Sequence, residues 1–170
     1  MRTHPTILGI SPGTRAVGLA VMKGGELREW RVKTFKGSWS HGKLKDVLYA
    51  LMNYVAEHSV KMIALKKPDV LRSSPALDQL VSEITVWAKM NRIKVTSYTL
   101  SELKQGFFNS KNVSKAEIIN QLIIKYPELQ TEYNKEKKNR NSYYAKMFEA
   151  VLVCQFRSKK SNLKMSLDAN

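Results

Sequence analysis

The sequence predicts an α/β domain built on a five-stranded mixed sheet with helices on both faces. Two observations favour this class. Up to about residue 35 the chain consists of three stretches of strand character separated by turn residues, which is typical of antiparallel strands. From residue 44 onward, stretches with the apolar period of a helix alternate with short apolar strands, an order that makes parallel pairs through crossover helices. A chain of 170 residues with 43% hydrophobic residues is long enough for one such domain.

Three meandering strands open the chain, at residues 6–10, 17–22 and 26–35. The first two are apolar and flank a Pro-Gly turn, and a Gly-Gly pair before the third is a hairpin signal. Strands joined by such short turns pair with their neighbours in antiparallel fashion. These residues therefore form the antiparallel half of the predicted sheet.

Helices and strands then alternate along the chain. Apolar residues at helical spacing predict a helix over residues 44–55, and residues 61–65 form a short buried strand. A Ser-Pro pair predicts the start of a second helix, over residues 74–91, because serine caps a helix and proline suits its first position. Residues 93–98 are the last predicted strand.

Two helices complete the predicted domain. A Ser-Lys-Ala-Glu capping box at residues 114–117 opens the first, and the second spans residues 141–156. The basic segment 134–141 is expected to be a mobile loop, and residues 157–170 a flexible basic tail. Residues 1–156 would then form a single domain.

The charge of the chain favours a polyanionic partner. Lys and Arg number 29 against 14 Asp and Glu, which gives a formal net charge of +15. A small protein with this surplus repels itself unless it meets a polyanion, so nucleic acid is the leading candidate. A membrane is not expected as a partner, because no apolar run approaches the roughly 20 residues of a spanning helix and no lipidation motif adjoins a basic amphipathic segment.

The sequence shows no pattern typical of a secreted protein, of a disulfide or of a zinc site. The first residues contain no apolar segment typical of a signal sequence, so an intracellular, cytoplasmic location is expected. Cys154 is the single cysteine and lies in an apolar run, which indicates a buried thiol. His4, His41 and His58 lack the spacing of zinc ligands.

The first hairpin resembles the opening of RuvC-type Holliday-junction resolvases, nucleases of the RNase H-like superfamily. The resemblance rests on the apolar strand, Pro-Gly turn and second strand at residues 7–21, and it returns at Ala64-Leu65-Lys66 and in the last helix at residues 146–151. It implies an RNase H-like fold over nearly the whole chain. Because resolvases act as two-fold dimers, it also implies a homodimer, to which the apolar face of the 74–91 helix would contribute unless that face is core.

The same resemblance identifies a degenerate catalytic site. In the family, acids occupy the positions of Ser11, Lys66 and Lys146, and only Glu149 retains a carboxylate here. Such nucleases use two divalent ions, whose charge several converging carboxylates must offset. A cation about 4 Å from a lysine costs on the order of 4 kcal/mol at an effective dielectric near 20, and a divalent ion doubles this cost. We therefore expect no metal here, and a cleft in which the two lysines pair with Glu149 or with phosphate.

The remaining candidates are cations on segments that border the DNA cleft in the family. Backbone phosphates are what such side chains contact. The predicted nucleic-acid-binding residues are Arg15, Lys66, Lys67, Arg72, Lys104, Lys111, Lys115 and Lys146.

These residues support three hypotheses about function. The leading one is a catalytically inactive relative of the resolvases that binds DNA, including branched four-way junctions, through a basic cleft. The second is an active structure-selective endodeoxyribonuclease that uses other acids with Mg²⁺ or Mn²⁺, which are the only cofactors considered. The third is a protein-binding scaffold with no nucleic-acid role.

Overall fold

The computed structural model describes residues 3–139 and 143–170 and contains one five-stranded sheet of order β3-β2-β1-β4-β5. The strands are β1 (Thr6–Ser11), β2 (Ala16–Lys23), β3 (Glu26–Thr34), β4 (Met62–Lys66) and β5 (Lys94–Tyr98). The first three pair antiparallel, whereas β4 and β5 run parallel to β1. The predicted mixed sheet with three meandering strands is confirmed.

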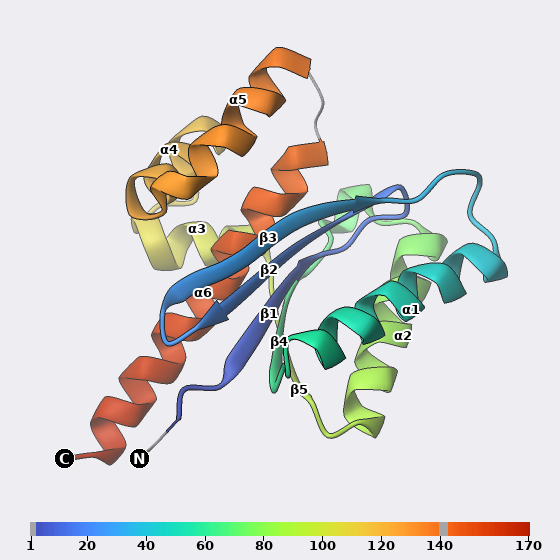
Figure 1. The fold of residues 1–170 in the computed structure, drawn as a ribbon. Helices are drawn as coiled ribbons and strands as arrows, with labels where there is room; N and C mark the ends of the chain where they lie inside the picture. The colour runs from blue at the N-terminus through green and yellow to red at the C-terminus, as the bar shows by residue number, and fades with distance from the viewer. Residues whose placement is uncertain (1–2, 140–142) are drawn as a thin grey trace.

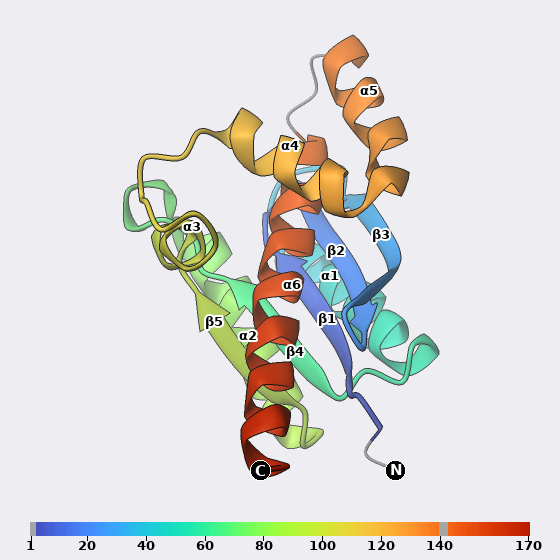
Figure 2. The ribbon, with the colours of Figure 1, turned by 90° about the vertical axis from the view of Figure 1, so that its left-hand side faces the viewer.

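Helices cover both faces of this sheet, as predicted (Figures 1 and 2). α1 and α2 pack on one face, and the long α6 crosses the other, with α3, α4 and α5 on the same side as α6. The helices are α1 (His41–Glu57), α2 (Pro75–Met90), α3 (Leu100–Phe108), α4 (Lys115–Lys125), α5 (Gln130–Asn139) and α6 (Tyr143–Asp168), and one-turn 3₁₀ helices occur at η1 (Val70–Arg72) and η2 (Pro127–Leu129).

The predicted helix caps are present. The Ser74 hydroxyl accepts a hydrogen bond from the backbone N–H of Leu77 at 3.2 Å, and Pro75 is the first residue of α2. Ser114 and Glu117 form a reciprocal capping box at the start of α4. Each satisfies backbone groups that a helix end leaves without a partner.

Two glycines allow α6 to lie directly on the sheet. A Cβ atom at Gly18 would lie 1.9 Å from the carbonyl oxygen of Lys146, and one at Gly9 would lie 2.2 Å from that of Ala150. Any other residue at either position would therefore move the helix away. The close approach sets the height of Lys146 and Glu149 above the strands, which matters for the site below.

Two segments that were predicted to be a loop and a flexible tail are helical. Residues 134–139 of the expected loop belong to α5, which is held by the Lys135–Glu132 ion pair at 3.4 Å and by packing of Tyr133 on the core; residues 140–141 of that loop lie outside the described residues. The expected tail from residue 157 is helical through Asp168. It extends α6, in which Ser158 is still buried.

The last predicted helix begins at Tyr143 among the described residues, and α3 was not predicted at all.

The structure also shows where the apolar face of α2 packs. Its residues Leu80, Ile84 and Ala88 are buried against the sheet, so this face belongs to the core and is unavailable for a dimer contact. Among the described residues, no helix is long and apolar enough to cross a membrane.

Candidate nucleic-acid cleft

The candidate site begins where two parallel strands end together. β1 ends at Ser11 and β4 at Lys66, and the pairing of Ile10 with Leu65 brings these two ends side by side. Ser11 is fully buried. The carboxyl ends of parallel strands form one edge of the sheet, which is the usual place for ligand sites in α/β folds.

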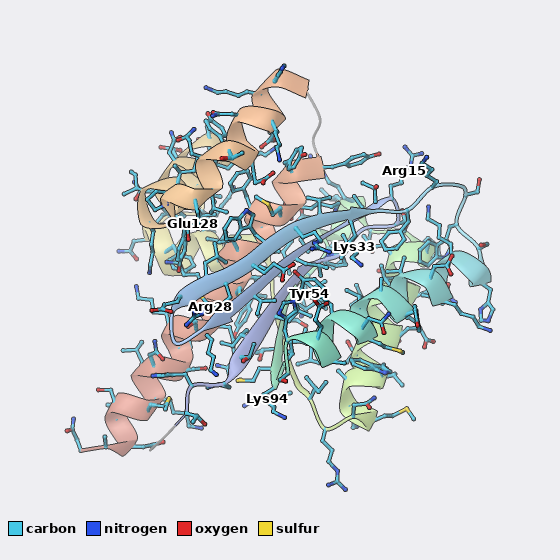
Figure 3. All side chains as sticks on the ribbon, in the orientation of Figure 1. Arg15, Arg28, Lys33, Tyr54, Lys94 and Glu128 are labelled. Atoms are coloured by element: carbon cyan, nitrogen blue, oxygen red, sulfur yellow. The ribbon has the colours of Figure 1, made fainter. Side chains whose placement is uncertain are left out.

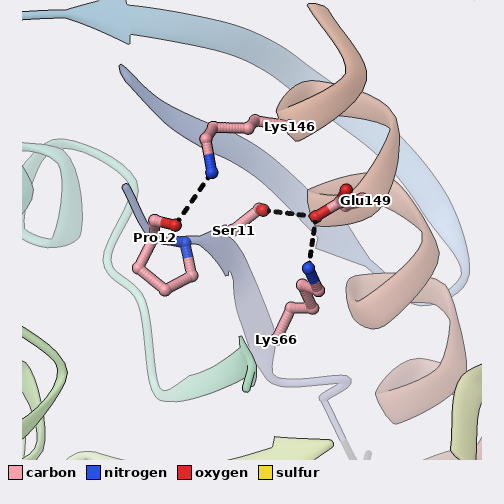
Figure 4. A network of polar contacts seen from close by, with 5 residues as sticks. All are labelled: Ser11, Pro12, Lys66, Lys146 and Glu149. Atoms are coloured by element: carbon pink, nitrogen blue, oxygen red, sulfur yellow. Dashed lines mark hydrogen bonds and ion pairs between the residues drawn. The ribbon is translucent and has the colours of Figure 1, made fainter. Parts of the chain in front are cut away.

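Helix α6 supplies the other half of the site (Figure 4). The Ser11 hydroxyl donates to Glu149 Oε2 at 2.8 Å, and Lys66 Nζ lies 3.0 Å from the same oxygen. Lys66 and Glu149 side chains are only 12% and 26% exposed. One carboxylate oxygen thus binds both the hydroxyl and the ammonium group at the two strand ends.

Lys146 has a different partner from the one expected. It donates to the carbonyl oxygen of Pro12 at 3.0 Å and forms no ion pair with Glu149 (Figure 4). The Pro-Gly turn lies directly against it, since a Cβ on Gly13 would be 2.7 Å from Lys146 Cε. Of the two predicted partners, Glu149 or phosphate, Lys66 therefore has Glu149, whereas the pairing of Lys146 with phosphate stays a prediction.

The burial of Lys146 makes its positive charge unfavourable for folding. Burial lowers the pKa of its ammonium group, the Glu149 carboxylate opposes this lowering, and Lys66 adds to it. Because the folded-state pKa lies below the unfolded one, the charged group opposes folding at neutral pH, and this cost disappears as the pH rises through the folded-state pKa towards the unfolded value. An anion beside Lys146 would offset the same cost, so the site favours an anionic ligand.

The two divalent ions that the resemblance implies do not fit these side chains. Metal ions of this class need several carboxylate or carbonyl oxygens, and here a lysine and a serine already bind the inner oxygen of Glu149. Over residues 3–139 and 143–170, no three His, Cys, Asp or Glu side chains form a group that could hold a metal ion.

A pocket of about 340 Å³ opens beside this network. Five of the eight predicted nucleic-acid-binding residues line it, and they come from five different segments of the chain: Lys66, Arg72, Lys104, Lys115 and Lys146. The carboxylates in its lining are Asp69 and Glu149, which leaves a formal surplus of three positive charges. The fold therefore brings most of the predicted cations to one place, next to the Glu149 network.

Two of these cations are already engaged, Lys66 with Glu149 and Lys115 with a residue of α5. Lys115 Nζ lies 3.0 Å from Glu136 Oε1, an ion pair that joins the start of α4 to α5. Among the described residues, Arg72, Lys104 and Lys146 form no ion pair with a carboxylate. These three are the cations of the pocket that remain available to a ligand.

The other three predicted residues lie outside the pocket. Lys67 and Lys111 are exposed on the segments after β4 and after α3. Arg15 lies at the β1–β2 turn (Figure 3) and lines a second, more open hollow that also contains Lys36 and Lys43. These last two lysines were not predicted from the sequence, because nothing in their spacing relates them to Arg15.

The apolar part of the pocket was not predicted from the sequence either. Leu100 of α3 and Ile118, Ile119, Phe148 and Leu152 of α4 and α6 form part of its lining. A usable signal for α3 was present. Thr99 and Glu102 form a capping box whose Thr-x-x-Glu pattern is visible in the sequence.

No protein-family model and no curated protein matches the sequence. Solved structures do match. RuvC of Thermus thermophilus in complex with a Holliday junction substrate superposes with a TM-score of 0.71 at 14% identity, over 95% of this chain and 97% of that one. The fowlpox virus resolvase, solved with Holliday junction DNA, gives 0.62 at 16% identity over 91% and 97%. The yeast mitochondrial Holliday junction resolvase Ydc2 gives 0.64 at 12% identity over 92% and 80%.

Proposed function

We propose that this chain, which has the RuvC-type RNase H-like fold, is a nucleic-acid-binding protein that holds DNA in a basic cleft without cutting it. The observation that carries the proposal is the Glu149 network. Where the resemblance implies carboxylates around two metal ions, Lys66 Nζ lies 3.0 Å from Glu149 Oε2 and Ser11 donates to the same oxygen. Positive charge that metal ions would supply is thus supplied by lysine.

Lysine ammonium groups and metal ions both attract phosphate, but they differ in their effect on a bound water molecule. A bound divalent ion lowers the pKa of its water and generates a nucleophile at neutral pH. An ammonium group donates hydrogen bonds to a phosphate oxygen and holds no water in this way. Lys66 and Lys146 are therefore suited to binding a phosphodiester and not to hydrolysing it.

Two further observations support DNA as the ligand. The pocket beside the network carries a surplus of positive charge within a chain whose formal net charge is +15. The RuvC and fowlpox virus resolvase structures that resemble this chain are complexes with Holliday junctions. Branched DNA is accordingly the form of nucleic acid that we propose.

The proposal includes the homodimer expected from the resemblance. Since Leu80, Ile84 and Ala88 are buried within the fold, an interface at α2 would use side chains that point outward. Val86 and Met90 are 50% and 79% exposed and are the apolar candidates on this helix.

Removing the available cations of the pocket tests the proposed binding mode. We expect the combined changes Arg72→Ala, Lys104→Ala and Lys146→Met to weaken binding to a four-way junction about a hundredfold at about 0.1 M salt, at about 1 kcal/mol for each lost phosphate contact. The slope of log K against log salt should fall in magnitude by about 0.9 for each contact removed. Fluorescence anisotropy across a salt series measures both quantities.

Lys94→Ala is the matched control, because Lys94 is an exposed lysine at the opposite end of the sheet from the cleft (Figure 3). We expect it to leave affinity and slope nearly unchanged. Equal losses in the control would show that binding follows net charge and has no defined cleft. Absence of binding by the unaltered protein at low salt would favour the scaffold hypothesis.

A further inference from the structure

We propose that the pocket beside Glu149 takes one unpaired nucleotide of the bound strand, with its base against the apolar side and its phosphate against the cations. This inference rests on the proposed function and specifies which part of the nucleic acid enters the site.

The size of the pocket limits what it takes. Its volume of about 340 Å³ is near the lower end for small-molecule sites, so it accommodates a group the size of a nucleotide and excludes a double helix. A base pair would have to open before either base entered. The pocket therefore selects single-stranded or locally unpaired nucleic acid.

The lining combines two chemistries that a nucleotide also combines. Leu100 of α3, which is partly buried, provides an apolar side, and the nearly fully buried Ile118, Ile119, Phe148 and Leu152 of α4 and α6 lie behind it. Nucleobases that leave a stack are held against apolar or aromatic side chains in this way, while a basic groove holds the backbone. A purely inorganic anion would make no use of the apolar side.

The polar lining favours the phosphate of that nucleotide. Arg72, Lys104 and Lys146 have no carboxylate partner among the described residues, and the buried ammonium of Lys146 is the one that an anion would stabilise most. Because Lys146 lies on α6 one turn before Glu149, the phosphate would sit next to the Glu149 network and the base farther along the pocket.

Two exposed apolar residues lie between residues of the pocket lining. Val70 and Leu71, in the one-turn helix η1, are 93% and 98% exposed, and the residues on either side of them, Asp69 and Arg72, line the pocket. Exposed apolar side chains beside a phosphate-binding surface are suited to enter a base step and unstack it. The gap left by a departing base would be covered by one of these side chains.

A bulged duplex tests the inference. We compare the affinity for a duplex with one bulged 2-aminopurine, the same duplex with an abasic bulge, and a fully paired duplex of equal length. We expect the base-bearing bulge to bind at least about fivefold more tightly than the other two, a difference of about 1 kcal/mol. The 2-aminopurine fluorescence should change as the base leaves the stack for the pocket.

Filling the apolar side of the pocket should remove the preference for the bulged duplex without changing the affinity for the paired duplex. Leu100→Trp, or Leu77→Trp if the first variant does not fold, places a large side chain at a partly buried position of the lining. We expect the affinity for the paired duplex to stay within twofold while the preference for the bulge disappears. Leu163→Trp, at an exposed position near the end of α6, is the matched control and should retain the preference.

The outcomes separate this inference from the proposed function. Equal binding of paired and bulged duplexes by the unaltered protein would overturn the nucleotide pocket and leave phosphate binding intact. No binding to any of these duplexes would also overturn the nucleotide pocket, and the proposed function would fall with it only if a four-way junction failed to bind as well. Competition by free dAMP without any preference for the bulge would assign the pocket to a free nucleotide and overturn its assignment to a strand.

Discussion

Replacing Glu149 by glutamine should lower the free energy of unfolding by about 2–3 kcal/mol and at the same time tighten DNA binding. Glu149 is the carboxylate that accepts from both Lys66 and Ser11, and the Lys66 side chain is only 12% exposed. Removing one partner of a buried ion pair typically costs about 3–5 kcal/mol, because the remaining charge has no counterion. Partial exposure of Glu149 and the retained glutamine oxygen reduce this value.

The gain in affinity follows from the charge of the cleft. Without Glu149, the pocket has one fewer carboxylate, and Lys66 is free to contact a phosphate. One additional phosphate contact is worth about 1 kcal/mol, or about fivefold in affinity. Chemical denaturation and anisotropy with a four-way junction measure the two effects.

Glu57→Gln makes the same change of charge at an exposed position near the end of α1 and is the matched control. We expect it to change neither quantity measurably. The double change Lys66→Met with Glu149→Met should recover most of the lost stability, since apolar replacement of a whole buried pair is often neutral. Weaker binding by Glu149→Gln at unchanged stability would mean that Glu149 itself contacts the ligand.

Introducing acids at the positions where the resemblance implies them should convert the cleft into a metal site. The combined changes Ser11→Asp, Lys66→Glu and Lys146→Asp place three carboxylates around Glu149, at positions that the fold already brings together. Without metal, each close pair of carboxylates costs up to about 4 kcal/mol at an effective dielectric near 20, which protonation relieves only in part. The triple variant should therefore be strongly destabilised at neutral pH.

Divalent ions should reverse this loss. At a concentration of Mg²⁺ or Mn²⁺ about 100 times its Kd, binding to the folded state contributes about 2.7 kcal/mol. For a chain of this size that corresponds to a rise of about 5–10 °C in Tm. The unaltered protein should show no such rise, because a lysine already binds its single carboxylate.

The neutral triple variant Ser11→Asn, Lys66→Gln and Lys146→Asn is the control for altered packing, and its Tm should not respond to either ion. A metal-dependent rise in the Tm of the unaltered protein would contradict the account. So would a triple-acid variant that remains as stable as the unaltered protein and indifferent to metal.

Most of the sheet and its covering helices were predictable because their signals are local. Strand 61–65 and the helix capped by Ser74 follow from apolar period and cap residues alone. α5 and the end of α6 were not predictable in this way. Their helical state depends on contacts from elsewhere in the fold, such as packing of Tyr133 on the core and burial of Ser158.

The candidate site likewise has a part that was predicted from the sequence and a part that was not. The resemblance placed Ser11, Lys66, Lys146 and Glu149 in one cleft, and the structure brings all four together. The Pro12 carbonyl as the partner of Lys146 was not foreseen, because it depends on how closely α6 approaches the Pro-Gly turn. The apolar side of the pocket depends equally on how α3 and α4 pack around α6, which no short motif encodes.

The most direct test of a cleft that binds without cutting is a combined gel-shift and cleavage assay on a labelled four-way junction, with and without Mg²⁺ or Mn²⁺. We predict a junction-selective shift that requires no divalent ion, weakens with salt and is accompanied by no cleavage products. Metal-dependent nicks that disappear in Glu149→Gln would contradict this account and would establish the chain as an active nuclease.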